Sequence, residues 1–83
     1  MTYPVASEAL QARYVRRDGV PVAVLRVGEN GEAAVVEAEV FPQSGGPPAR
    51  PGPYTFANAR EAEAFVTDAV EALIYLGCDV SDA

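Results

Sequence analysis

Cys78 is the only cysteine of this chain of 83 residues, and the only strong nucleophile among its side chains. A cysteine reacts as the thiolate, which a neighbouring histidine or another positive charge normally stabilises. The chain contains no histidine, and the adjacent Asp79 disfavours a negative sulfur. Cys78 also follows Gly77, at a position where an apolar side chain commonly packs back onto a helix end, here onto Leu73. We therefore expect a packing role for Cys78, with redox or nucleophilic use as the alternative.

Glu37 and Glu39 are two residues apart, so an extended strand presents both carboxylates on one face. Such a pair could share a hard cation or divide acid and base roles. The spacing is also common on solvated strands, and Arg13 could approach Glu37 across the sheet. Asp79 and Asp82 lack the regular ligand spacing of a calcium loop and are expected in a tail. We predict a solvated charge pattern, with no catalytic residue, no metal and no cofactor.

Arg13, Arg16 and Arg17 form the one basic cluster and could bind an anion or nucleic acid through a hairpin. The chain as a whole has six arginines, no lysine and twelve acidic residues, and its net charge of −6 repels phosphate backbones. The order of three strands and one helix is similar to that of double-stranded-RNA-binding and AP2-type DNA-binding domains. Those domains need basic residues on the contacting helix or sheet, whereas residues 60–63 are Arg-Glu-Ala-Glu. Nucleic-acid binding is therefore disfavoured.

A proline- and glycine-rich loop is expected at residues 42–53, which hold five of the seven prolines and three of the seven glycines. Pro48-Ala49-Arg50-Pro51 has the outline of a polyproline ligand, although a rigid connector is the simpler interpretation. A small-ligand or enzymatic site between this loop and the helix, using Tyr54, Arg50 and Cys78, is an alternative function.

Two tight turns, Asp18-Gly19 and Asn30-Gly31, predict a three-stranded antiparallel meander over residues 11–17, 20–27 and 32–41. Pro21 would remove a ladder donor from the central strand, so it is expected at the first positions of that strand or at a bulge.

If both turns contain two residues, counting outward from them assigns each side chain to a face. One face would be apolar: Leu10, Ala12, Tyr14, Ala23, Leu25, Val27, Ala34, Val36 and Ala38. The other face would combine charge with a valine patch: Arg13, Val15, Val20, Val22, Val24, Val35, Glu37, Glu39 and Phe41.

A helix over residues 59–76 is predicted from Asn58 as N-cap, Glu61 three residues later, and Gly77 after its last turn. At about 100° per residue, one apolar stripe forms that the apolar sheet face must cover. Its members are Ala62, Phe65, Val66, Ala69, Val70, Leu73 and Leu76. Tyr75 lies on the opposite, polar face of the helix, with Ile74 on its flank, and either stands in water or marks a contact.

The predicted architecture is therefore a single small α+β domain over residues 1–83, a meander backed by one C-terminal helix. Tyr54 and Phe56 could form a short fourth strand or pack as a staple onto the core. Residues 7–10 could form a short helix or begin the first strand.

These expectations favour a small non-enzymatic protein-interaction or regulatory module. Because the core is small and one sheet face is uncovered, we expect a homodimer, with a different protein partner also possible. The predicted interface consists of Val15, Val22, Val24, Val35, Phe41 and Tyr75. No apolar run is long enough to span a membrane, and the single cysteine favours a cytoplasmic location.

Overall fold

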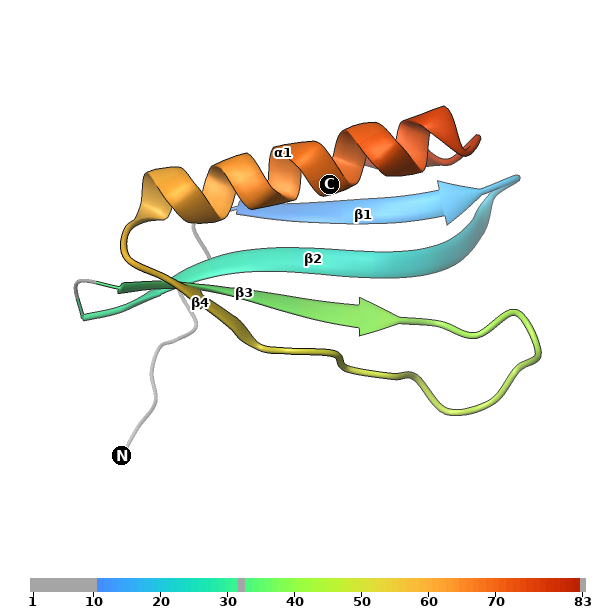
Figure 1. The fold of residues 1–83 in the computed structure, drawn as a ribbon. Coiled ribbons are helices and arrows are strands. Elements are labelled where there is room, and N and C mark those ends of the chain that lie inside the picture. Colours follow the sequence, from blue (N-terminus) through green and yellow to red (C-terminus); the bar gives the residue numbers. More distant parts are fainter. Residues whose placement is uncertain (1–10, 32, 83) are drawn as a thin grey trace.

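The computed structural model describes residues 11–31 and 33–82. Its elements are β1 (Gln11–Arg17), β2 (Val20–Asn30), β3 (Ala33–Val40), β4 (Tyr54–Phe56), α1 (Ala59–Tyr75) and β5 (Asp79–Ser81). The strands form one antiparallel sheet in the order β4-β3-β2-β1-β5, and α1 lies across one face of it (Figure 1). The predicted α+β architecture is confirmed, whereas the alternatives for residues 7–10 lie outside the described residues.

The first hairpin contains a β-bulge that the sequence-based count omits. Asp18 and Gly19 have φ values of 54° and 82°, as expected for a two-residue turn with both central φ angles positive. Arg16 pairs with Pro21, but the register then shifts, and the next pair leaves Val22 without an opposite residue. Because proline has no N–H for the ladder, its place beside a bulge agrees with the expectation for Pro21.

The bulge reverses the faces of β1, so the predicted register was wrong there. Val15 lies opposite Ala23 and shares the face under α1, whereas Ala12 and Tyr14 lie on the outer face. Arg13 is opposite Leu25, so it also belongs to the helix side and is half-buried. One extra residue in one strand is sufficient for this change, because side chains alternate with a period of two.

The second hairpin is shifted by two residues, and an even shift leaves the predicted faces unchanged. Asn30 pairs with Ala33, and Val27 lies opposite Val36 instead of Ala34. Leu25, Val27, Ala34 and Val36 therefore face the helix as predicted, although their cross-strand neighbours differ, and Val22, next to the bulge, changes side.

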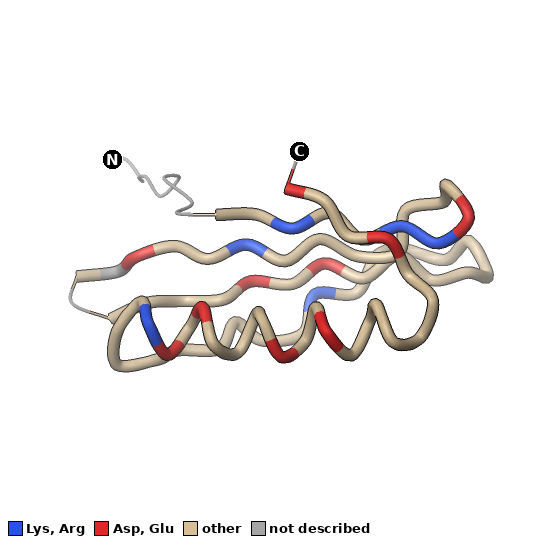
Figure 2. The backbone as a smooth tube through the Cα atoms, turned by 90° about the horizontal axis from the view of Figure 1, so that it is seen from above, with Lys and Arg blue, Asp and Glu red and all other residues tan. Residues whose placement is uncertain are grey.

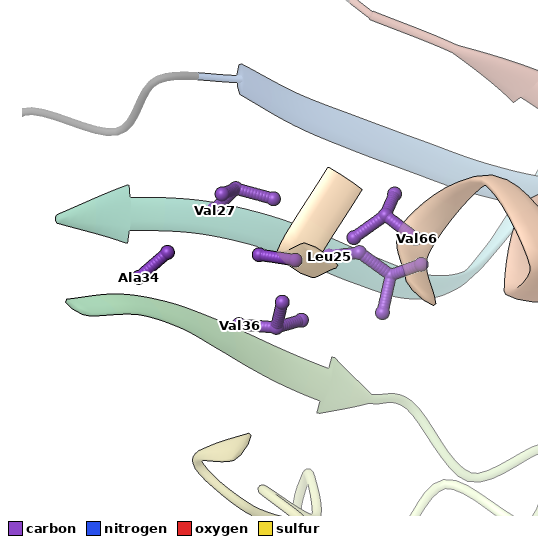
Figure 3. Close-up of a cluster of buried hydrophobic side chains, with 6 residues drawn as sticks. Leu25, Val27, Ala34, Val36 and Val66 are labelled. Carbon is purple, nitrogen blue, oxygen red and sulfur yellow. The ribbon is translucent and has the colours of Figure 1, made fainter. Parts of the chain in front are cut away.

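Two clusters of buried side chains hold the helix on the sheet. The larger lies under the first half of α1 and contains Leu25, Val27, Ala34, Val36, Ala62 and Val66 (Figure 3). The smaller contains Val15, Ala23 and Cys78, with Leu73, Val22 and Val80 packed against it.

The proline-rich loop returns along the edge of β3. Ala49 forms an isolated bridge with Val40, in which each N–H donates to the other carbonyl at 2.8 and 2.9 Å. Tyr54 and Phe56 then continue as β4, and both rings pack on Phe65 with centroids 5.3 Å away. The segment is thus a short strand, and its two aromatic side chains also hold the helix against this edge of the sheet through their contacts with Phe65.

Both ends of α1 have the predicted caps. The Asn58 side chain accepts a hydrogen bond from Glu61 N–H at 2.9 Å, and Glu61 in turn accepts one from Ala57 N–H at 3.4 Å. At the other end, Gly77 has a φ of +96° and its N–H donates to Ile74 O at 2.9 Å. This is a Schellman motif.

Strand β5 was missed by the sequence analysis, which places Asp79 and Asp82 in a tail. Val80 lies opposite Val15 and packs on the smaller cluster. A three-residue strand carries little signal of its own, because it forms only once the Schellman turn brings it against β1.

Candidate functional site

Cys78 is buried at 9% exposure in the smaller cluster. Its N–H donates to Leu73 O at 3.0 Å, and the Leu73 side chain packs against the same cluster. The expected packing position is therefore confirmed. Tyr54 packs on Phe65 and Arg50 pairs with Glu39, so the structure does not bring these two side chains to Cys78.

Glu37 and Glu39 lie on the outer face of the sheet, as predicted, but their cationic neighbours were not foreseen. Arg26, not Arg13, is directly opposite Glu37 on β2. Arg50, from the proline-rich loop, donates to Glu39 at 3.2 Å. These four side chains, with Ala38, Pro51 and Pro53, line a cleft of about 360 Å³. Each glutamate thus has an arginine beside it, so the cleft has mixed charge.

Arg13, Arg16 and Arg17 do not form a single basic surface. The half-buried Arg13 lies on the helix side and donates to the carbonyl of Ala12 at 3.2 Å. Arg16 is exposed and lies opposite Asp79 on β5, so a basic and an acidic residue are cross-strand neighbours there. Arg17 is exposed at the hairpin tip.

The predicted interface residues are divided between several environments. Val15 is 1% exposed and belongs to the core, so it is unavailable for contact. Val22 is half-buried and packs on the helix side, because the bulge redirects it. Val24 and Val35 do occupy the outer face, but Val24 is only 8% exposed, and the ladder places Arg26 and Glu37 between the two valines. No continuous valine patch therefore forms on the described outer face.

Phe41 and Tyr75, the two remaining predicted interface residues, lie outside the strands. Phe41 follows β3, is half-buried, and donates its N–H to Val22 O at 2.8 Å. Tyr75 is 90% exposed at the end of the helix. Of the six predicted residues, Tyr75 is therefore the one with the most open side chain.

Several exposed apolar side chains gather at the C-terminal end of α1. Among the described residues, the four most exposed large apolar side chains are Tyr75 at 90%, Leu76 at 62%, Ile74 at 54% and Val20 at 53%. We call these four residues the end patch. Val20 belongs to it because the first hairpin and the end of α1 lie at the same end of the domain (Figure 1).

A groove of about 550 Å³ adjoins the end patch. Its apolar wall comes from Val20, Val22, Leu73, Leu76 and Cys78, and its rim from Arg17, Asp18 and Gln43. The sheet and the helix therefore share this groove, whereas Tyr75, about 200° around α1 from the sheet-facing Leu73, projects from the other side of the helix.

The sequence contains a signal for the end patch that the stripe analysis does not use. Residues 73–76 are Leu-Ile-Tyr-Leu, so at about 100° per residue apolar side chains surround the whole last turn. A helix that is apolar on all sides normally has neighbours on all sides. The sheet covers only Leu73, and Leu76, predicted within the buried stripe, is exposed.

Within residues 11–31 and 33–82, no three acidic, cysteine or histidine side chains come close enough to hold a metal ion. The helix of this described part is too short and too polar to cross a membrane. No protein-family model, curated protein or solved structure matches the chain.

Proposed function

We propose that the protein is a non-enzymatic protein-interaction module, and that the end patch is its contact site. The observation that carries this proposal is the exposure of three consecutive apolar side chains, Ile74 to Leu76, around one helix end. Together with Val20 they gather exposed apolar side chains at one end of the domain, and such surfaces on monomers are often functional.

Side chains, rather than strand pairing, supply the contact in this proposal. β4 and β5 are the edges of the sheet, and each has three residues. Pro51 and Pro53 precede β4, whereas β5 carries Asp79 and is followed by Asp82. Short strands, prolines and charges are the features by which natural sheets avoid pairing at their edges.

The environment of the strongest nucleophile supports a non-enzymatic role. Cys78 is buried against apolar neighbours, and the chain has no histidine to activate it. The proposal also includes a cytoplasmic location, where a single cysteine stays reduced. Cell fractionation with antibody detection checks this part.

Site-specific photocrosslinking in cells tests the proposed contact site. A benzophenone amino acid replaces Tyr75 in one variant and Thr55, which is exposed on β4, in the control. We expect a discrete protein adduct from position 75 and none from position 55. Equal labelling from both positions, or none from position 75, contradicts the proposal.

A second candidate function, small-ligand binding, rests on the cleft beside the proline-rich loop. Arg26 and Arg50 could hold a carboxylate, while Glu37 and Glu39 could hold an amine, so a zwitterion such as a free amino acid fits the mixed charge. A thermal-shift screen of amino acids should then show stabilisation that Arg26→Ala removes. If no amino acid shifts the unfolding temperature of the parent protein, this candidate fails.

A further inference from the structure

We infer that the partner at the end patch is a basic, amphipathic segment of a different protein. This inference rests on the proposed function and names the chemistry of its partner. Apolar side chains of the segment cover the exposed turn at residues 74–76. Its lysine or arginine side chains lie against Asp68 and Glu71, on the outer side of α1.

Tyr75 and two acidic residues share one side of the helix. Glu71 precedes Tyr75 by four residues and Asp68 by seven, so at about 100° per residue both lie within about 40° of it around the helix axis. All three side chains are exposed, and we call these three residues the acidic side of α1. Ile74, which is 54% exposed, lies on its flank, about 60° from Glu71. Apolar contact area and negative charge therefore adjoin each other.

The net charge of the chain comes entirely from the helix and the residues after it. Residues 1–60 contain six arginines and six acidic residues, whereas residues 61–83 contain the other six acidic residues and no basic one. Along α1, acidic positions are the only charged ones after Arg60 (Figure 2). A helix C-terminus adds the equivalent of about half a negative charge, which a basic side chain in the last turn often offsets. The last turn of α1 has no such side chain, so a cation from a partner is favoured there.

The two arginines of the first hairpin do not balance this charge. Arg17 lines the groove together with Asp18, and Arg16 lies opposite Asp79 on β5. Each arginine thus has an acidic residue beside it on the sheet, and the acidic side of α1 remains negative.

These charges distinguish between the possible occupants of the end patch. Nucleic acids and anionic membranes carry phosphates, which the acidic side of α1 repels. A second copy of the chain, bound through this side on a two-fold axis, would place the acidic side against itself. A small cation would leave Ile74, Tyr75 and Leu76 in water. A basic amphipathic protein segment matches both the apolar and the charged groups.

Nuclear magnetic resonance titration of the full chain with two synthetic peptides tests the inference. Each peptide is an amphipathic helix of about 14 residues with leucines on one side, and the other side carries lysines in the first peptide and glutamates in the second. We expect the lysine peptide to shift the amide signals of residues 68–76 and to bind at least about tenfold more tightly than the glutamate peptide. Equal affinity for the two peptides overturns the inference.

Charge-reversal variants locate the contact. Glu71→Arg should weaken binding of the lysine peptide about fivefold and strengthen binding of the glutamate peptide, and misfolding cannot cause the second effect. Glu63→Arg is the matched control, because it changes the net charge equally but lies about three turns before Tyr75, beyond the screening length of physiological salt. It should change either dissociation constant by less than about twofold. Equal effects of the two reversals contradict a contact at the acidic side.

The anchor is tested separately. Tyr75→Ala should weaken binding of the lysine peptide about tenfold, because it removes the most exposed aromatic side chain of the end patch. An unchanged dissociation constant contradicts a contact through Tyr75.

Photocrosslinking in cells separates this inference from the proposed function. The adduct from position 75 should decrease in Glu71→Arg and persist in Glu63→Arg. An adduct that persists in both variants excludes the basic partner and leaves the interaction module in place. An adduct with the mass of two copies of this chain has the same consequence. The absence of any adduct from position 75 removes both the inference and the proposed function.

Discussion

The two ends of α1 are equally well capped but differently packed. At the first end, Asn58 caps the helix and the residues that follow pack on β3 and β4, with Ala62 fully buried. At the last end, Gly77 completes a Schellman motif, yet Ile74, Tyr75 and Leu76 are exposed. Capping therefore determines where the helix begins and ends, while the extent of the sheet determines how much of its apolar surface is covered.

The outer side of the helix shows the same contrast. Glu61, Glu63, Asp68 and Glu71 make the first four turns polar toward solvent, and these charges stop before the last turn (Figure 2). A helix turn that is exposed but carries no charged side chain is expected where another protein surface binds to it.

Shortening a buried side chain in the first half of the helix should have the largest effect on stability. Val66 is 2% exposed and packs in the larger cluster. Val66→Ala should lower the free energy of unfolding by about 2 to 3 kcal/mol, because it removes two buried methyl groups and leaves a cavity. Urea denaturation followed by circular dichroism measures the loss. A change below about 1 kcal/mol would mean that this half of α1 is not firmly packed.

Replacing the C-terminal glycine cap should have the next largest effect. Gly77 has a φ of +96°, and a Cβ there meets no atom within 4 Å, so the cost is one of backbone conformation alone. Gly77→Ala should destabilise the protein by about 1 to 2 kcal/mol. Gly77→Asn, which tolerates this conformation better, is the matched control and should cost less. Equal losses in both variants would contradict the backbone explanation.

Removing the N-cap should cost somewhat less, about 1 kcal/mol in Asn58→Ala. The loss follows from the hydrogen bond that Glu61 N–H donates to the Asn58 side chain. Asn58→Ser keeps an acceptor and should retain most of the stability. The account of this helix end is wrong if the serine and alanine variants unfold at the same urea concentration.

Truncating the end patch should have the smallest effect on the isolated domain. Tyr75→Ser, measured without a partner, should change the free energy of unfolding by less than about 0.5 kcal/mol, because the side chain is 90% exposed. A saturating concentration of the lysine peptide should stabilise the parent protein more than the variant. Equal stabilisation of both proteins speaks against a role of this residue in binding.

The local chemistry of particular residues explains how much of the fold could be predicted. Asn58 acts through its own side-chain oxygen, and Gly77 and Asp18-Gly19 act through their backbone conformation, so the helix and the first turn follow from the sequence. Pro21 indicated a possible bulge, but the resulting register depends on which residue the ladder leaves unpaired. The position of Val15 in the core could therefore not be obtained by counting.

The candidate site was only partly predictable for a related reason. Tyr75 was recognisable as an aromatic residue on the polar side of a helix, and it is exposed as expected. The sequence analysis assigned Val20 to the outer sheet face and Leu76 to the buried stripe of the helix. The structure brings these two residues to one groove, because the bulged hairpin ends beside the last turn of α1. The cleft between Arg26 and Arg50 likewise forms only when the proline-rich loop returns along β3.

Site-specific photocrosslinking tests the central claim, that the end patch is the contact site, most directly. With a benzophenone amino acid at position 75, where the side chain is 90% exposed, the account predicts a discrete protein adduct. Equal labelling from position 55 on β4, or no adduct from position 75, would contradict it.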